Sequence, residues 1–162
     1  MNPNAYLHEQ MKIVQGLAPV TLGGSGEDAV SLKGYQRLTI VLHINNGAAA
    51  TGAAVTLKQS SDVAESDPKT LAFDTMWANL DCAATDTLVE TAVTSDTFDT
   101  DDTNGKDLMY VMEIQATDLD VANGFAVVRL DLVALTDADV SILYLLWPAK
   151  DAKATPVSAI LD

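Results

Sequence analysis

The fold is decided most clearly by residues 37–45, which read Arg-Leu-Thr-Ile-Val-Leu-His-Ile-Asn. In an extended chain, successive side chains point to opposite faces of the sheet. One face would carry four large apolar residues and the other a mixture: Leu38, Ile40, Leu42 and Ile44 against Thr39, Val41 and His43. Because both faces are at least partly apolar, we expect a central strand that is covered on both sides.

A second alternating stretch follows at residues 53–59, with Ala53, Val55 and Leu57 on one face. Between the two stretches lies Asn45-Asn46-Gly47, and Asn-Gly supplies the positive φ angles of a tight hairpin turn. The sequence therefore predicts that strands 37–45 and 53–60 pair antiparallel.

The second half of the chain shows the same alternation at residues 109–116, 125–135 and 140–147. The clearest case is 125–135, which places apolar residues inward and charged residues outward: Val128, Leu130 and Leu132 against Arg129 and Asp131. Turn signals separate these stretches at Asn104-Gly105, Asn123-Gly124 and residues 136–139. Weaker strands are expected near residues 11–17, 71–78 and 88–93.

Little helix is expected, since 18 of the 23 acidic residues are Asp, which favours turns over helix interiors. No stretch carries the helices that parallel strands need as crossovers. The prediction is an all-β domain: an antiparallel β-sandwich, jelly-roll-like, of about eight strands with extended N- and C-terminal arms.

The length of 162 residues suits one domain. Residues 1–27 hold Pro3, Pro19 and the Gly-rich run 23–26, and we expect an N-terminal arm with one possible strand. Residues 28–147 would form the sandwich. Residues 148–162 contain Pro156 and are expected to be a C-terminal tail, whose apolar end is a candidate for docking on a neighbour.

The net charge of −14 argues against two classes of partner. Nucleic acid and anionic membranes both need clustered Lys and Arg, so neither is expected. A basic protein partner or plain solubility fits the charge better. No run approaches the ~20 apolar residues that span a bilayer, and the first residues do not read as a secretory signal. We expect a protein that is made and kept in a cytoplasm, or in a particle that is assembled there.

The sequence offers little for catalysis. His8 lies in the irregular N-terminus, His43 lies on a strand face, and neither has a neighbouring motif. Cys82 is surrounded by acidic residues that would raise its pKa, and we interpret it as a small buried residue. One Cys and two distant His cannot form a zinc site. We expect no catalytic residues, no metal site and no cofactor.

Two features leave other functions open. Residues 81–107 hold eight acidic residues and one lysine, and the loop 96–107 lacks the spacing of a helix–loop–helix calcium site. A looser calcium site stays possible there, as does a solvated loop or an acidic surface for a basic partner.

Trp77 and Trp147 could stack on sugar, although core or interface packing is the commoner use of such residues. A carbohydrate- or calcium-binding β-module is therefore the alternative from a different class.

Three segments together carry a family resemblance: residues 32–44, with Tyr35-Gln36-Arg37 entering the first strand; residues 54–62, Ala-Val-Thr-Leu-Lys-Gln-Ser-Ser-Asp; and residues 125–131, Phe-Ala-Val-Val-Arg-Leu-Asp. In this order, with a long polar insertion before the last, they resemble small virion proteins of tailed bacteriophages that are taken to be head decoration or cement proteins. The likeness covers roughly residues 30–147.

The resemblance implies a structural virion protein that lies on the outside of a mature phage head and clamps neighbouring capsomers. Its partners would be the major capsid protein and copies of itself, often as a homotrimer, and assembly would take place in the host cytoplasm. The family offers no catalytic residues to transfer. A tail or neck component is the near alternative.

Subunit contacts are expected from the partly apolar outer faces of strands 37–45 and 140–147. Our interface candidates are three residues of the last strand and two of the tail: Leu143, Leu145, Trp147, Val157 and Ile160.

Overall fold

The computed structural model describes residues 6–21 and 26–148, and these form an antiparallel β-sandwich. Within these residues, helix is confined to three short pieces: α1 (Leu7–Gln10), η1 (Ala116–Asp118) and η2 (Val121–Asn123). The strands are β1 (Lys12–Thr21), β2 (Val30–Ser31), β3 (Tyr35–Thr51), β4 (Ala54–Ser60), β5 (Lys69–Thr70), β6 (Thr75–Asn79), β7 (Val89–Ala92), β8 (Thr97–Asp99), β9 (Asp107–Gln115), β10 (Val127–Leu132) and β11 (Thr136–Pro148). The expected fold class is confirmed, and the described residues form more strands than the sequence indicated.

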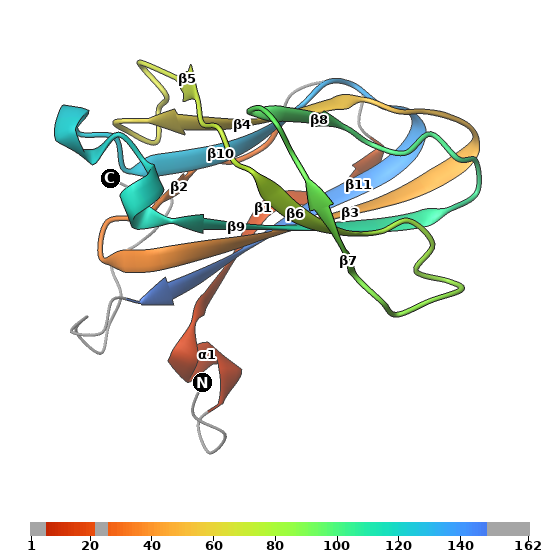
Figure 1. Cartoon of the computed structure of the whole chain (residues 1–162), viewed down its shortest axis with the longest axis horizontal. Helices are drawn as coiled ribbons and strands as arrows, with labels where there is room; N and C mark the ends of the chain where they lie inside the picture. Colours follow the sequence, from red (N-terminus) through yellow and green to blue (C-terminus); the bar gives the residue numbers. More distant parts are fainter. Residues whose placement is uncertain (1–5, 22–25, 149–162) are drawn as a thin grey trace.

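The strands form two sheets that lie one above the other (Figure 1). The larger sheet has the order β1-β11-β3-β9-β6-β7. The smaller sheet has the order β2-β10-β4-β5, and β8 also pairs with β4. Every pairing is antiparallel, as expected for a chain without crossover helices.

The core lies between the two sheets and is built by strict alternation. In β3 the side chains of Leu38, Ile40, Leu42 and Ile44 are fully buried, as the sequence predicts. β11 and β10 present their own alternate residues to the same core, and they include Ile142, Tyr144, Leu146, Val128 and Leu130. The predicted inward and outward residues of β10 are therefore confirmed.

The predicted hairpin between residues 37–45 and 53–60 is wrong. β3 continues through Asn45-Asn46-Gly47 to Thr51, and it pairs with β11 and β9. β4 belongs to the other sheet, where it pairs with β10, β5 and β8. The chain turns from one sheet to the other just after β3, so the strongest local turn signal lies inside a strand.

Tertiary contacts explain why the Asn-Gly sequence stays extended. The side-chain amide of Asn46 donates to the carbonyl oxygens of Asp101 and Thr103, at 3.0 and 3.1 Å. A Cβ on Gly47 would lie 2.5 Å from the exposed Asp137 carboxyl group, so glycine leaves room for that side chain in its present position. The other Gly turn signals are confirmed, because Gly105 and Gly124 have positive φ angles of 67° and 85°.

Residues 136–139, expected as a turn, lie within β11. The register between β11 and β3 shifts between Thr136 and Ala138, and Asp137 between them has a positive φ of 50°. A bulge at this point bends the strand without ending it.

The first described residues bring a strand into the larger sheet. β1 pairs with β11 from Lys12 opposite Leu146 to Thr21 opposite Asp139. α1 precedes β1 and stands away from both sheets, below the larger one in Figure 1. No residue of α1 is buried. The division of the chain into arm, sandwich and tail remains a prediction.

The net charge of −14 predicts that salt stabilises the fold. The ion pairs of the described residues are at least partly exposed to solvent, as Arg37 with Glu113 at 3.4 Å illustrates, and exposed pairs contribute little. Screening the repulsion among the excess carboxylates should therefore outweigh the weakening of the ion pairs. We expect the melting temperature to rise by about 2–4 °C, which corresponds to roughly 1 kcal/mol, when NaCl is raised from about 20 to about 500 mM.

Calorimetry at low protein concentration measures this shift, and KCl should reproduce it if screening is the cause. A melting temperature that falls as salt is added would show that the ion pairs dominate.

Candidate functional site

The outer face of the larger sheet, which points away from the smaller sheet, carries an apolar surface. Leu143, Leu145 and Trp147 of β11 all lie on it, because the residues between them are buried in the core. Leu143 is 43% exposed and Leu145 and Trp147 are half-buried. The structure therefore brings the three predicted β11 residues together. Val157 and Ile160, the other two interface candidates, lie outside the described residues.

Cross-strand register extends this surface over neighbouring strands. Leu143 lies opposite Val41 of β3, which lies opposite Val111 of β9, which lies opposite Trp77 of β6. In the next row, Ile13 of β1 lies opposite Leu145 and is 48% exposed. We call the seven residues Ile13, Val41, Trp77, Val111, Leu143, Leu145 and Trp147 the outer apolar face.

The sequence analysis missed Ile13 and Val111 as interface candidates. Alternation within each strand assigns a residue to one face or the other, and it did so correctly for Val111. Which strands lie side by side was the missing information, because β1 and β11 are far apart in the sequence and pair directly.

Trp147 is held at the border of this surface by polar contacts. Its indole N–H donates to the Thr39 hydroxyl at 3.2 Å. The Arg37 guanidinium lies over its ring, 4.6 Å from the centroid, and also pairs with Glu113. A tryptophan that is oriented in this way offers a fixed edge to a neighbouring surface.

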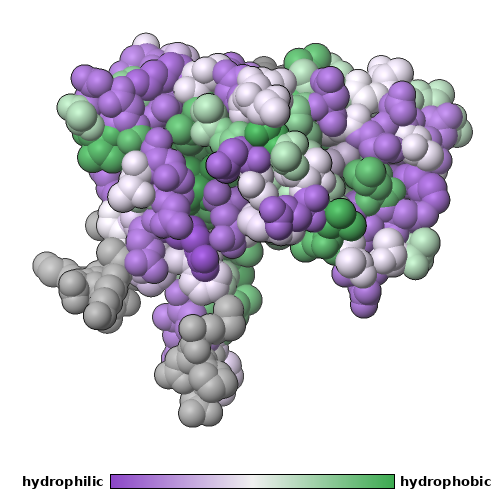
Figure 2. Space-filling model, viewed as in Figure 1, coloured by the Kyte–Doolittle hydropathy of each residue, from purple (hydrophilic) through white to green (hydrophobic). Residues whose placement is uncertain are grey.

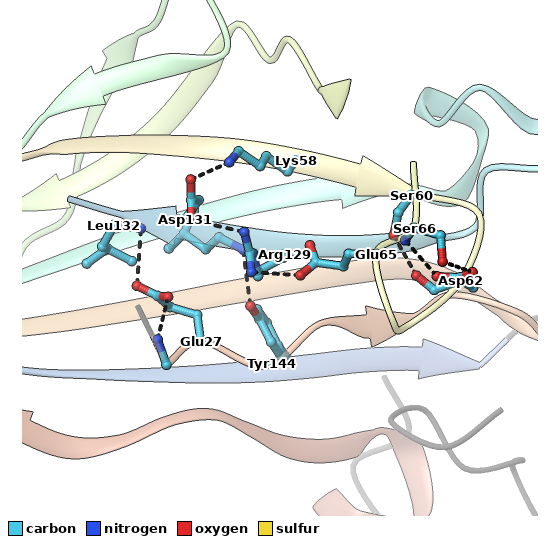
Figure 3. Close-up of polar contacts among 12 residues, drawn as sticks. Glu27, Lys58, Ser60, Asp62, Glu65, Ser66, Arg129, Asp131, Leu132 and Tyr144 are labelled. Carbon is cyan, nitrogen blue, oxygen red and sulfur yellow. Dashed lines mark hydrogen bonds and ion pairs between the residues drawn. The ribbon is translucent and has the colours of Figure 1, made fainter. Parts of the chain in front are cut away.

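The outer face of the smaller sheet differs, because it is covered by charged side chains that already have partners (Figure 3). Asp131 pairs with Lys58 at 2.5 Å and with Arg129 at 3.1 Å. Arg129 also binds Glu65 at 2.7 Å, which holds the loop of residues 61–67 against the sheet. Burial raises the pKa of Glu65, and the positive charge of Arg129 acts against that rise.

The loop is also braced internally, since the Ser66 N–H and hydroxyl both donate to the Asp62 carboxylate. These bonds lower the pKa of Asp62. On the smaller sheet, the outward charged groups thus form ion pairs with one another, whereas the outer apolar face of the larger sheet is left to solvent or to a partner.

Two buried groups, the Tyr144 hydroxyl and the Glu27 carboxylate, accept hydrogen bonds from backbone N–H groups of β10 (Figure 3). The hydroxyl of Tyr144, which is fully buried, accepts from the Leu130 N–H at 3.2 Å. Burial raises the pKa of Tyr144 above its ordinary range. The buried Glu27 accepts from the Leu132 N–H at 3.2 Å and from the Gly26 N–H at 3.0 Å. Both groups position strands and neither faces a cavity in the described structure.

The residues tested for catalysis lie on separate elements. His8 is exposed in α1, and His43 lies half-buried on the outer face of the larger sheet opposite Met109. Within residues 6–21 and 26–148, no three His, Cys, Asp or Glu side chains gather in a way that could hold a metal ion.

Cys82 is partly exposed, so its interpretation as a buried residue is wrong. It lies in the loop after β6, where its backbone N–H donates to the Asp107 carbonyl. Burial, together with the carboxylates of Asp107 and Asp81, raises the pKa of its thiol, in the direction that the sequence predicts.

A groove opens where β6 separates from β9. The two strands pair only from Trp77 opposite Val111 to Asn79 opposite Met109, while β9 continues to Gln115. The opening has a volume of about 730 Å³ and is lined by residues 72–75, Trp77, residues 93–95, Glu113, Ile114 and Asp118. Figure 2 shows a hollow here, with hydrophobic surface at its bottom and hydrophilic surface on both sides.

Comparisons with known proteins do not identify a family. No family model matches the sequence, and no curated protein matches it. Among solved structures, the chain is similar to the crystal structure of the SPBc2 prophage-derived protein YomS, with 12% sequence identity and a TM-score of 0.45. That match covers 84% of this chain and 91% of the other. Among the described residues, no helix has the length and apolarity needed to cross a membrane.

Proposed function

We propose that this chain is a structural virion protein of a tailed bacteriophage, a capsid decoration or cement protein that binds the outer surface of a mature head. It works as a homo-oligomer, with a trimer as the expected form, and it contacts the major capsid protein. It has no catalytic role and needs no cofactor. The sequence resemblance supplies the virion role, and the outer apolar face supplies the means of assembly.

The observation that carries the proposal is the contrast between the two outer faces. On the smaller sheet, charged residues pair with one another and with a loop of the same chain. On the larger sheet, Leu143 and Ile13 remain 43% and 48% exposed beside half-buried Val41 and Leu145. Large contiguous apolar surfaces of soluble proteins mark interaction sites. A neighbouring subunit would bury them.

Symmetry and a high copy number allow stable assembly even if the affinity of each single contact is modest. A closed ring repeats one interface several times, and a capsid lattice engages many copies together. A protein that binds only the mature lattice stabilises that lattice by mass action. The acidic surface limits association to places where the apolar contact or a basic partner outweighs charge repulsion.

The test is to replace Leu143 with Asp. Burying a leucine contributes about 1.5–3 kcal/mol, so its loss at the interface should weaken self-association at least about tenfold. Sedimentation velocity of the wild type at tens of micromolar should show an oligomer, and Leu143→Asp should show a monomer. The melting temperature of the monomer should change little, because Leu143 is outside the core.

Val121→Asp is the matched control. Val121 is 61% exposed in η2 and lies outside the outer apolar face. The control should associate like the wild type. Capsid binding is then measured by mixing each protein with mature heads and locating it by electron microscopy. A wild type that stays monomeric and binds no head overturns the proposal, and density at the neck or along the tail would place the protein there instead.

A further inference from the structure

We infer that the groove between β6 and β9 binds an arginine side chain of a partner protein. The inference rests on the proposed function, because it names the chemistry of one contact in the assembly. It concerns a different surface from the outer apolar face, with Trp77 at the border of both.

The groove exists because the sheet opens at this point. On one side of β9, pairing with β3 continues to Gln115 opposite Arg37. On the other side, pairing with β6 ends at Val111. β6 turns toward β7, with which it pairs from Thr75 opposite Ala92 to Ala78 opposite Val89. The last residues of β9 therefore border an open groove instead of another strand.

The walls are aromatic and fixed in position. Trp77 is held in β6 by pairing on both of its sides, with Val111 and with Glu90. Phe73 packs edge-on against Phe98, with 6.3 Å between ring centroids. Flat aromatic walls of this kind are the surfaces on which a guanidinium group stacks.

The groove is also negatively charged. Asp74, Glu113 and Asp118 line it, and the described lining contains no Lys or Arg. Glu113 has two long contacts, with the Arg37 guanidinium and with the Thr39 hydroxyl, each at 3.4 Å. Asp118 accepts from the Gln115 backbone N–H at 2.8 Å. The Asp74 carboxylate has no ion-pair partner among the described residues.

Arginine fits this combination better than other ligands. It presents a planar cation that stacks on tryptophan and donates two parallel hydrogen bonds to a carboxylate. A volume of about 730 Å³ accommodates such a side chain with part of its backbone. A neutral sugar would use the aromatic wall and leave the carboxylates of Asp74 and Asp118 without a cation.

The test is a titration of the full chain with Nα-acetyl-arginine-methylamide, monitored by NMR at 150 mM NaCl. We expect millimolar binding that shifts the Trp77 indole signal far more than the Trp147 signal. The matched ligand is the citrulline analogue, which has the same shape without the charge. It should bind at least tenfold more weakly.

Asp74→Asn keeps the shape of the side chain and removes one charge, and it should weaken arginine binding at least threefold. Asp86→Asn is the control, because it removes the same charge from the exposed loop between β6 and β7. Equal binding of citrulline, equal loss in both variants, or shifts spread over the whole acidic surface would overturn the inference. So would a Trp77 shift with maltose that exceeds the shift with arginine.

The outcome is independent of the oligomer test. If arginine fails to bind while Leu143→Asp abolishes self-association, the groove inference fails and the proposed function stands.

Discussion

Replacing Gly16 with alanine is expected to lower the free energy of unfolding by about 3 kcal/mol, at the upper end of the usual cost of overpacking a core. A Cβ at this position would lie 2.5 Å from Cε2 of Tyr144 and 2.9 Å from Cγ2 of Ile142. Both side chains are fully buried, so neither can move aside into solvent. Gly16 lies at the register shift of β1, between Gln15 and Leu17.

Urea unfolding measures the change, with Gly26→Ala as the matched control. A Cβ on Gly26 meets only Leu17 Cδ1, at 3.8 Å, which is an ordinary contact. The control should stay within about 0.5 kcal/mol of the wild type. If the two alanine variants are equally stable, the approach of β1 to Tyr144 is looser than described.

Replacing Glu27 with alanine is expected to lower the free energy of unfolding by about 2–3 kcal/mol. The Glu27 carboxylate is buried and accepts from the backbone N–H groups of Leu132 and Gly26. A buried donor that loses its acceptor costs about 1–3 kcal/mol. Leu132 ends β10, so the substitution should also loosen that end of the smaller sheet.

Hydrogen exchange provides a local measurement of this effect, since the Leu132 amide should exchange faster in Glu27→Ala. Glu27→Gln should be intermediate, because it keeps one acceptor oxygen and turns an NH₂ group toward the other donor. Glu90→Ala removes an exposed carboxylate from β7 and should change stability little. Equal stability of Glu27→Ala and Glu90→Ala would contradict the assigned role of Glu27.

Much of the local structure could be predicted from alternation alone. Strands formed within the predicted ranges 37–45, 109–116 and 125–135, although the last strand is limited to Val127–Leu132. Their inward and outward residues are the expected ones. The failure at Asn45-Asn46-Gly47 has a physical reason, because a turn propensity is small compared with the contacts that Asn46 and Gly47 make with residues far away in the sequence. Local propensity is a weak prior that tertiary context overrides.

The candidate interface could likewise be predicted only in part from the sequence. Leu143, Leu145 and Trp147 were assigned to one face from their spacing, and the structure places them together. Only the strand register shows that Ile13 and Trp77 belong to the same surface, because β1 pairs with β11 and β6 pairs with β9. The groove beside Trp77 could not be predicted, because it depends on where β6 leaves β9.

The sequence by itself determined the β class, the absence of long helices from the described chain, and which face of its strand each residue occupies, because the period of an extended chain is a local property. The tertiary structure alone decided which strands are neighbours, which outer face is left apolar, and where the sheet opens. These features depend on contacts between residues far apart in the sequence, such as Ile13 with Leu145, and no local pattern encodes them.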